Sequence, residues 1–407
     1  MRALYTVALR LALPFLVLRL WWRGRREPGY RESMSERFGL YQVDRPERLL
    51  WIHAVSVGEA RAAEPLVRAL NGALPDHRIL ITCTTAAGRE TIKQVYGEAT
   101  LTVFLPYDFP EAAQAFLEYF RPRLAIVMET EVWPNLLARC ARYGVPVMLA
   151  NARLSERSAR GYRRWRALAE PAFASLAAVC AQSAADAERL RAAGARSVEV
   201  TGNLKFDVTP DAGQLAAGAA WRKAVDRPVL LLASTREGEE SMLLASRPAD
   251  ARLLVVVVPR HPRRFDAVAA MGDSRRSHQP MPAAEDRIHV GDSMGEMAFY
   301  YAACDVAIIG GSFAPLGGQN LIEALAAGAA VIVGPHMYNF AEATELAIQS
   351  GAARQVGDAA AAVRTALELL ANQRERQRMS EAGRNLWNQH RGATARHLAI
   401  CQRLLRL

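Results

Sequence analysis

Short apolar runs alternate with amphipathic stretches from residue 48 onward. The apolar runs in the first half are RLLWIHAVS, RILITCT, LTVFLPYD, PRLAIVMETE and VPVMLANA. Between them lie stretches with helical periodicity, such as GEARAAEPLVRAL and AGRETIKQVYG. Strands that are apolar throughout and separated by helices are typical of a parallel sheet covered by helices on both faces. The pattern therefore predicts a Rossmann-like α/β domain over residues 27–207.

The same alternation of apolar runs and amphipathic stretches continues in the second half of the chain. Its apolar runs are RPVLLLAST, ARLLVVVVPR, DRIHVGDS, CDVAIIGGS and AAVIVGPH. The polar segment LKFDVTPDAGQ, which contains Pro and Gly, separates the two series and reads as an interdomain linker. A length of 407 residues also favours two domains over one. We therefore expect a second Rossmann-like domain over residues 208–407, ending in basic helices, and two domains that face a central cleft.

The first 26 residues have a different pattern. Residues 3–22 are apolar apart from Arg10 and Arg19, and the basic run RGRR follows directly at 23–26. A 20-residue helix is about 30 Å long, enough to cross a bilayer, but an arginine at the bilayer centre costs about 2.5–3.5 kcal/mol. Residues 1–26 are therefore predicted to anchor the chain to a membrane, either spanning it or lying in its surface, with the rest of the chain in the cytoplasm. A signal peptide and a buried core helix are the alternatives.

Composition narrows the class of protein only partly. The hydrophobic share of 51% and the charged share of 23% are ordinary for a globular protein, which argues against disorder and against a polytopic membrane protein. The net charge of +10 suits nucleic acid, an anionic membrane surface or phosphorylated substrates, and does not choose between them. The five cysteines form no C-x-x-C pair, so neither a zinc site nor a disulfide framework is expected.

Ligands of open α/β sheets lie beyond the carboxyl ends of the strands, so residues that follow strands are the candidates for chemistry. In the first domain Glu59 follows the first strand in SVGE, and Glu129 and Glu131 follow a later strand in METE. A carboxylate there can accept a proton from a substrate hydroxyl, especially where burial raises its pKa. Glu59 could equally be a first-turn acid favoured by the helix dipole, and the METE carboxylates could form salt bridges. Lys205 in GNLKFD could hold a phosphate, or could be an ordinary surface lysine.

The second domain offers candidates for holding an anion. VVVVPRH places Arg260 and His261 after a buried strand, where a guanidinium can hold a phosphate or carboxylate. The run IIGGSFAPLGGQNLIEALAAG places glycines ahead of a helix that starts near Asn320, and helix N-termini bind anions. Glu323, on the first turn of that helix, suits sugar hydroxyls. The absence of a Walker motif and of G-x-G-x-x-G weakens kinase and dehydrogenase interpretations.

Taken together, these residues closely resemble the bacterial 3-deoxy-D-manno-octulosonic acid (Kdo) transferases over nearly the whole chain. The matching segments are RLWWRGRREPGYRESMSERFG, HAVSVGEARAAEPLVRAL, FLPYD, METEVWPN, NARLSERSARGY, TGNLKFD, STREGEES, VPRHPRRF, GDSMGE, GGQNLIEA and GPHMYNF. The resemblance implies a GT-B glycosyltransferase fold and inverting transfer of Kdo from CMP-Kdo to the lipid A precursor (lipid IVA) in lipopolysaccharide inner-core biosynthesis. It further implies action at the cytoplasmic face of the inner membrane, with no cofactor and no metal in the transfer step.

The resemblance also implies roles for particular residues. Glu59 matches the general base of the family, and Glu129 and Lys205 match its transition-state stabilisers. The positions that match the family's CMP-binding segments are Pro259, Arg260, Gly295, Glu296, Met297, Asn320, Leu321, Ile322 and Glu323. Arg236 and Gln319 depart from the family pattern, in which we expect histidines at these positions, although both keep a hydrogen-bond donor.

The expected partners are the CMP-Kdo donor, the lipid A precursor and the anionic inner-membrane surface, without nucleic acid. All three are negatively charged, so the basic balance of the chain favours their capture. Two alternatives stay open: another GT-B protein such as a UDP-sugar transferase or epimerase, and a non-catalytic membrane protein that binds lipopolysaccharide precursors. Binding by such a non-catalytic membrane protein needs no base, so it would not depend on Glu59. The sequence leaves open how many Kdo residues are added.

Overall fold

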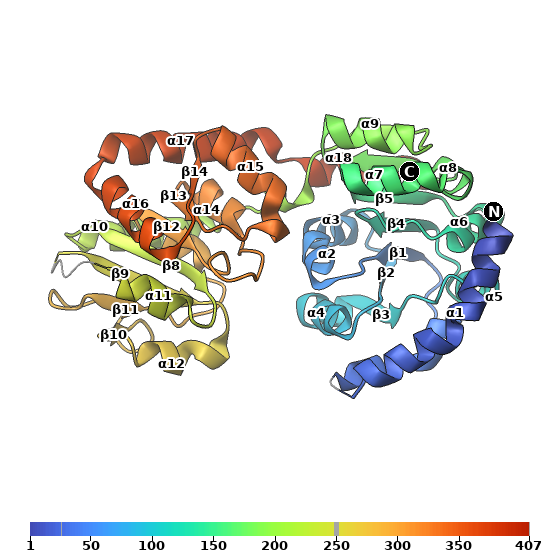
Figure 1. The fold of residues 1–407 in the computed structure, drawn as a ribbon, viewed down its shortest axis with the longest axis horizontal. Helices are drawn as coiled ribbons and strands as arrows, with labels where there is room; N and C mark the ends of the chain where they lie inside the picture. The colour runs from blue at the N-terminus through green and yellow to red at the C-terminus, as the bar shows by residue number, and fades with distance from the viewer. Residues whose placement is uncertain (26, 248–251, 407) are drawn as a thin grey trace. The chain divides into compact units, whose positions relative to one another are not determined.

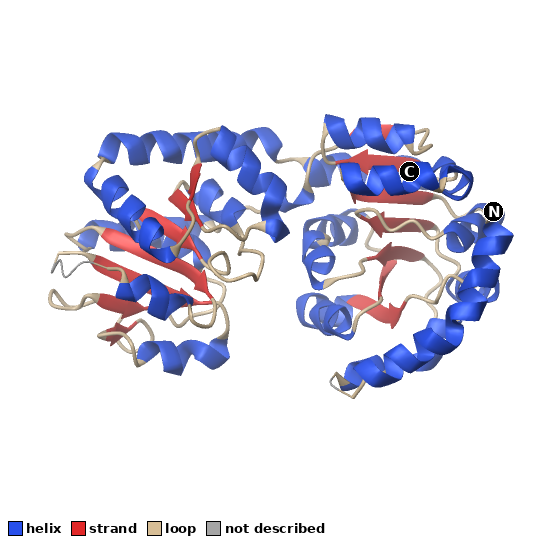
Figure 2. Cartoon of the chain, in the orientation of Figure 1, coloured by secondary structure: helices blue, strands red, loops and turns tan. Residues whose placement is uncertain are grey.

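The structure is a computed structural model that describes residues 1–25, 27–247 and 252–406 (Figure 1). The chain divides into two compact units, one of Met1–Asp207 with Arg391–Leu407 and one of Val208–His390. Within the described residues each unit is built on one seven-stranded parallel sheet flanked by helices (Figure 2). The predicted pair of Rossmann-like domains is therefore confirmed, and the central cleft between them remains a prediction. Arg26, the last arginine of the expected anchor, lies outside the described residues.

The first sheet has the strand order β3-β2-β1-β4-β5-β6-β7. Its strands are β1 (Leu49–His53), β2 (Arg78–Cys83), β3 (Thr100–Phe104), β4 (Leu124–Met128), β5 (Val147–Ala152), β6 (Ala178–Ala181) and β7 (Val198–Val200). The order reverses where β1 pairs with β4, and this switch point is where open α/β sheets bind their ligands. The loops that follow β1 and β4 are thus the expected place for chemistry in this unit.

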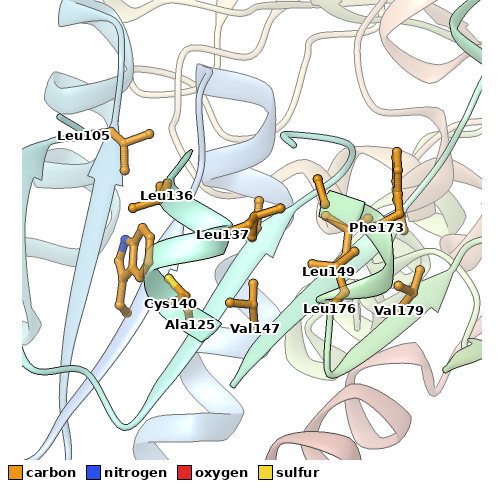
Figure 3. Close-up of a cluster of buried hydrophobic side chains, with 14 of the residues drawn as sticks. Leu105, Ala125, Leu136, Leu137, Cys140, Val147, Leu149, Phe173, Leu176 and Val179 are labelled. Atoms are coloured by element: carbon orange, nitrogen blue, oxygen red, sulfur yellow. The ribbon is translucent and has the colours of Figure 1, made fainter. Parts of the chain in front are cut away.

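Helices cover both faces of the first sheet, because alternate strand residues point to opposite sides. Leu49 and Trp51 of β1 belong to one buried cluster, and Leu50 and Ile52 belong to the other. The covering helices are α2 (Val57–Ala62), α3 (Glu64–Ala73), α4 (Ala86–Tyr96), α5 (Pro110–Phe120), α6 (Pro134–Arg142), α7 (Glu156–Arg164), α8 (Arg166–Ala174) and α9 (Ala184–Ala192). Figure 3 shows Leu136, Leu137 and Cys140 of α6 packed in the first of these clusters beside Ala125 of β4 and Val147 of β5.

The second sheet has the order β10-β11-β9-β8-β12-β13-β14, with its switch point between β8 and β12. Its strands are β8 (Val229–Thr235), β9 (Leu254–Pro259), β10 (Ser274–Arg275), β11 (Ile288–Val290), β12 (Val306–Ile309), β13 (Ala330–Val333) and β14 (Ala353–Gln355). Its helices are α10 (Ala212–Ala224), α11 (Glu239–Ala245), α12 (Phe265–Ala269), α13 (Met297–Ala302), α14 (Leu321–Ala327), α15 (Ala341–Gln349), α16 (Ala359–Ala371) and α17 (Gln373–His390). The central strands β8, β9 and β12 are buried along their whole length, as the continuous apolar runs predict.

The last helix, α18 (Ala393–Leu405), packs on the first unit and not on the second, which we had expected to run to residue 407. Its buried residues Ile400, Cys401 and Leu405 lie on one helical face and join the cluster that also contains Leu66 of α3. The carboxylate of Asp207 accepts hydrogen bonds from the backbone N–H groups at the start of α18. An amphipathic helix shows in the sequence, but its pattern does not say which of two sheets its apolar face covers.

The N-terminal helix α1 (Arg2–Arg23) is, among the described residues, the one helix long and apolar enough to cross a membrane. It is nevertheless tied to the first unit. The side chains of Thr6 and Asn135 are hydrogen-bonded at 2.9 Å, and Arg10 pairs with Glu111 at 2.5 Å. Its other face carries a stripe of exposed apolar side chains, which are Leu4, Leu11, Phe15 and Leu18.

Candidate active site

Glu59 lies on the first turn of α2, directly beyond the carboxyl end of β1. Ser56 caps the helix: its Oγ accepts the Glu59 N–H at 3.4 Å and donates to Glu59 Oε1 at 3.1 Å. The Val55 N–H donates to Glu59 Oε2 at 2.8 Å. The sequence S-x-x-E thus forms a close relative of the capping box, and the structural role considered for Glu59 is present. It also fixes the carboxylate at the switch point of the sheet.

A purely capping carboxylate would have a low pKa, because hydrogen bonds and a helix N-terminus stabilise its charge. Glu59 has the opposite shift. Burial raises the pKa of Glu59 to about 7, the charges of Glu129 and Glu131 add to the rise, and the hydrogen bond from Val55 opposes it. A general base works best when its pKa lies near the working pH. The surroundings of Glu59 therefore fit proton transfer better than capping alone.

Glu129 follows β4 in a left-handed backbone conformation, with φ of +55°. This conformation costs a non-glycine residue about 1–3 kcal/mol and is often found at functional sites. Its Oε2 accepts a hydrogen bond from Arg153 Nε at 2.9 Å, so the salt bridge considered as an alternative role for Glu129 is present. Burial, and then the charge of Glu129, raise the pKa of the Glu131 carboxyl. The structure thus brings Glu59, Glu129 and Glu131 together in a cluster of three carboxylates.

Lys205 lies in the short helix η4 (Leu204–Asp207), which follows β7 at the same edge of the sheet. Its backbone is firmly held: the Lys205 N–H donates to Asn203 Oδ1, and the Leu204 N–H donates to Asn151 Oδ1, both at 3.0 Å. Gln182 bridges the two amides, because it accepts from Asn203 Nδ2 at 3.0 Å and donates to the Asn151 carbonyl at 2.7 Å. A network of buried amides therefore fixes the loop that carries Lys205.

The network is supported from the C-terminal helix by His397, which is fully buried. The Asn151 N–H donates to His397 Nε2 at 3.0 Å, so the ring proton sits on Nδ1 and is donated to the Ala393 carbonyl at 2.7 Å. Burial lowers the pKa of His397 to about 4, which keeps the ring neutral and Nε2 an acceptor. Our sequence reasoning missed both Asn151 and His397. Asn151 lies in the matched segment NARLSERSARGY, but no local pattern connects it with a residue 246 positions away.

In the second unit Arg260, after a strand end, and Glu323, at a helix start, lie close enough for their charges to interact. Burial raises the pKa of the Glu323 carboxyl, and the charge of Arg260 opposes the rise. The Arg260 N–H donates to the Thr235 carbonyl at 3.0 Å, which joins the turn after β9 to the end of β8. Asn320 caps α14, with its Oδ1 accepting the Ile322 N–H at 3.0 Å. Pro259 and Leu321 are the last residue of β9 and the first of α14.

Glu239, a fully buried carboxylate on α11, organises the glycine-rich loop after β12. It accepts backbone N–H groups of Arg236, Gly311 and Phe313 at 2.8, 2.6 and 3.0 Å. At Gly310 a Cβ would lie 2.6 Å from a Cα of β8, so a larger residue does not fit there. Glu239 was not among the predicted site residues, although it lies in the matched segment STREGEES. Its role is to hold the backbone of this loop by charge-assisted hydrogen bonds.

The segment Gly295–Met297 leads into α13. Gly295 has φ of +78°, and Met297 is the first residue of the helix. The Glu296 carboxylate lies 3.3 Å from Arg276 Nε. A hydrogen bond from Ser293 and the charge of Arg276 lower the pKa of Glu296 despite partial burial. Because its carboxylate is already engaged, this segment would contact a nucleotide mainly through its backbone.

The two residues that depart from the family pattern lie beside the same loop. The Arg236 N–H donates to Glu239, and the Gln319 N–H donates to the Gly310 carbonyl at 3.0 Å. Both contacts use the backbone, so they do not depend on which side chain is present. Within residues 1–25, 27–247 and 252–406, no group of three or more His, Cys, Asp or Glu side chains is placed to hold a metal ion.

The molecule has two Rossmann-like units, with Glu59 of raised pKa in one and the partly buried Arg260 and Glu323 beside glycine-rich loops in the other. This arrangement fits a glycosyltransferase of the GT-B class. A family model described as 3-deoxy-D-manno-octulosonic-acid transferase (kdotransferase) matches residues 32–208, and one described as glycosyl transferases group 1 matches residues 283–386. The chain is 48% identical to the 3-deoxy-D-manno-octulosonic acid transferase of Bordetella pertussis, with 98% of each chain covered. It is 34% identical to that of Haemophilus influenzae, with 98% of this chain and 97% of the relative covered. The chain belongs to the Kdo transferase family.

Solved structures extend the likeness in fold. The complex of S. aureus MnaA with UDP matches with a TM-score of 0.56 and 16% sequence identity, covering 88% of this chain and 97% of that chain. At this level of identity the match shows a shared fold alone. A GT-B fold for this chain is therefore confirmed, independently of what its ligands are.

Proposed function

We propose that this protein is an inverting glycosyltransferase that moves Kdo from CMP-Kdo to the lipid A precursor (lipid IVA) in lipopolysaccharide inner-core biosynthesis, with Glu59 as general base. The single observation that carries the proposal is the carboxylate of Glu59, which lies at the switch point with a pKa of about 7. Membership of the Kdo transferase family supports Kdo as the transferred sugar.

In the proposed reaction a hydroxyl of the acceptor attacks the anomeric carbon of Kdo while the CMP phosphate leaves. Glu59 accepts the hydroxyl proton as the new glycosidic bond forms. Burial keeps the pKa of Glu59 high and the charges of Glu129 and Glu131 add to the rise, so its carboxylate is a stronger base than an isolated glutamate. The ammonium group of Lys205, on a loop fixed by buried amides, would stabilise negative charge in the transition state.

The CMP moiety is assigned to the second unit. Arg260 suits the phosphate, since a guanidinium can donate two parallel hydrogen bonds to it. Glu323, next to Arg260 on the first turn of α14, suits the ribose hydroxyls. The Asn320-capped start of α14 and the backbone of Gly295–Met297 complete the segments assigned to the nucleotide.

We further propose that α1 holds the enzyme at the cytoplasmic side of the inner membrane by lying in its surface. Thr6 and Arg10 bind the first unit, so the N-terminal half of α1 is not available to cross a bilayer. The exposed stripe of Leu4, Leu11, Phe15 and Leu18 would enter the apolar region, a geometry typical of interfacial helices. Of the two alternatives that the sequence leaves open, spanning the membrane or lying in its surface, these contacts support the second.

The decisive experiment is mass spectrometry of the product formed by purified full-length protein, CMP-Kdo and lipid IVA. We expect the acceptor to gain the mass of one or more Kdo residues, and the number of additions is read from the same spectrum. Thermal unfolding with CMP and with UDP is the companion measurement, because a ligand that binds only the folded state raises the melting temperature. Protection by UDP alone, with no Kdo added, would contradict the proposal in favour of a UDP-sugar enzyme.

A further inference from the structure

An apolar groove of about 850 Å³ lies on the first unit, bounded by α1, by the loop between β4 and α6, and by α7 and α8. Its volume is within the range of about 300–1,000 Å³ that is common for small-molecule sites. The apolar and aromatic side chains that line it include Leu4, Val132, Trp133, Tyr162, Trp165 and Leu168. Trp165, between α7 and α8, is 58% exposed although it is one of the largest apolar side chains of the chain. Such an exposed apolar surface commonly marks a binding site.

The groove joins the candidate active site to the exposed stripe of α1. Glu131, which contributes to the raised pKa of Glu59, is one of its lining residues and lies two positions beyond Glu129. At the helix, Leu4 lines the groove and also begins the stripe that continues through Leu11. A molecule in this groove would therefore touch both the catalytic loop and the helix assigned to the membrane surface.

A second groove, of about 1,000 Å³, lies along another side of α1 and shares Met1, Pro134 and Leu168 with the first. Its charged lining residues are all cationic: Arg2, Arg10, Arg139 and Arg142. Apolar and cationic surfaces side by side are complementary to an anionic amphiphile, which has acyl chains next to phosphate groups.

We propose that the apolar groove receives an acyl chain of the lipid acceptor while the reacting sugar lies at Glu59. This inference rests on the proposed function and adds to it the part of the acceptor that is recognised. The aromatic walls bury methylene groups, and each buried methylene contributes favourably to binding. The acyl chain thereby orients the sugar hydroxyl toward the base, which is a matter of positioning and not of chemistry.

Gly161 of α7 is a position at which a larger side chain should occupy the groove. It lines the groove and lies inside a helix, and a Cβ at this position would meet nothing within 4 Å. The Cβ of Gly161→Trp therefore meets no clash, its indole should occupy part of the groove, and tryptophan is also a better helix former than glycine. Gly72 of α3 is a matched control, since it too is a helical glycine whose Cβ would meet nothing within 4 Å, and it does not line the groove.

The test compares two acceptors in detergent micelles: lipid IVA, and the same phosphorylated disaccharide stripped of its acyl chains. Gly161→Trp should raise KM for lipid IVA roughly tenfold, the factor for excluding about two methylenes, and leave kcat near wild type. KM for the deacylated acceptor should not change, and Gly72→Trp should match wild type with both acceptors.

Three results would overturn the inference. The first is a wild-type KM of Gly161→Trp for lipid IVA together with unchanged sedimentation with anionic vesicles, because the groove would then bind neither the acyl chain nor the membrane. The second is an equal rise of KM for both acceptors, because the groove would then bind the sugar. The third is an unchanged KM in micelles together with weaker sedimentation with anionic vesicles, because the groove would then be only a membrane contact. If wild-type protein transfers no Kdo to either acceptor, the proposed function fails and not the inference about the groove. Calorimetric binding of lipid IVA to Gly161→Trp and Gly72→Trp then still tests whether the groove binds the acyl chain.

Discussion

Replacing Glu59 by Gln keeps the shape of the side chain and removes its ability to accept a proton. General-base catalysis is worth about 10²- to 10⁴-fold, so turnover should fall by that factor. In wild-type protein the base must be ionised, so the rate should rise as pH increases through about 7, the pKa of Glu59, and level off above it. In Glu59→Gln this dependence on pH should disappear, while CMP binding by the second unit should stay the same.

Glu59→Gln should lower the rate of transfer, but it should raise the stability of the folded protein at high pH. The folded-state pKa of Glu59 is raised to about 7, so the folded chain binds its proton more tightly than the unfolded chain does. The resulting stability is fully present below the unfolded pKa and is lost as pH rises through about 7. From these two pKa values the loss between pH 5 and pH 8.5 is about 2–3 kcal/mol. Gln has no charge to bury, so Glu59→Gln should be the more stable protein at pH 8.5.

The assay combines single-turnover transfer across pH, with donor and acceptor saturating, and thermal unfolding of the first unit at pH 5 and pH 8.5. A gain of about 2–3 kcal/mol corresponds to a rise of roughly 5–10 °C in melting temperature for a unit of this size, and little difference is expected at pH 5. Glu64→Gln is the matched control, because Glu64 is a first-turn acid of the next helix and is paired with Arg68. The assignment fails if Glu59→Gln keeps more than about a tenth of the rate while Glu129→Gln abolishes transfer and its rise with pH.

Three further predictions concern the nucleotide, the buried network and the membrane. Arg260→Ala should weaken CMP binding by about 1.5–3 kcal/mol in calorimetry, whereas the exposed Arg263→Ala should not; equal affinities would remove Arg260 from the nucleotide site. His397→Ala leaves the Asn151 N–H without its acceptor, which should cost about 1–3 kcal/mol of stability and lower kcat, and His397→Gln should restore both. A loss of stability with unchanged kcat would make the network merely structural. A chain that begins at residue 27 should move from the membrane fraction to the soluble fraction and still transfer Kdo to micellar acceptor; a folded but inactive product would give α1 a further role.

The sequence predicts which residues lie at the carboxyl edge of the first sheet, for a physical reason. A continuous apolar run must be a buried strand, and the residues after it must lie at the carboxyl edge of a parallel sheet. Glu59 and Glu129 are adjacent in space because their strands pair, and this follows once the strand order is that of a Rossmann fold. Arg260 and Glu323 meet in the second unit by the same logic.

The supporting contacts could not be predicted in this way. Asn151 has φ of +52°, and its backbone N–H, its carbonyl and its Oδ1 bond to His397, Gln182 and Leu204, which come from three other parts of the chain. Glu239 is a first-turn acid of α11 and is fully buried, because three backbone N–H groups offset the cost of desolvating its carboxylate. The groove beside α1 depends on tertiary contacts such as those of Thr6 and Arg10, which fix the helix against the rest of the first unit. These are tertiary contacts without a local signature.

The return of α18 to the first unit means that the second unit is inserted into the first, entered after Asp207 and left at Arg391. During synthesis the first unit therefore cannot complete its core when its own first 207 residues have emerged. The apolar surface that α18 covers stays exposed until the ribosome has synthesised the entire second unit and then α18. A nascent or truncated chain that lacks the last 17 residues would carry Glu59, Glu129 and Lys205 but no His397 to hold their neighbour Asn151 in place. The order of synthesis thus delays assembly of the first unit until the polypeptide is complete, so fragments arising from interrupted translation should be inactive and prone to aggregation.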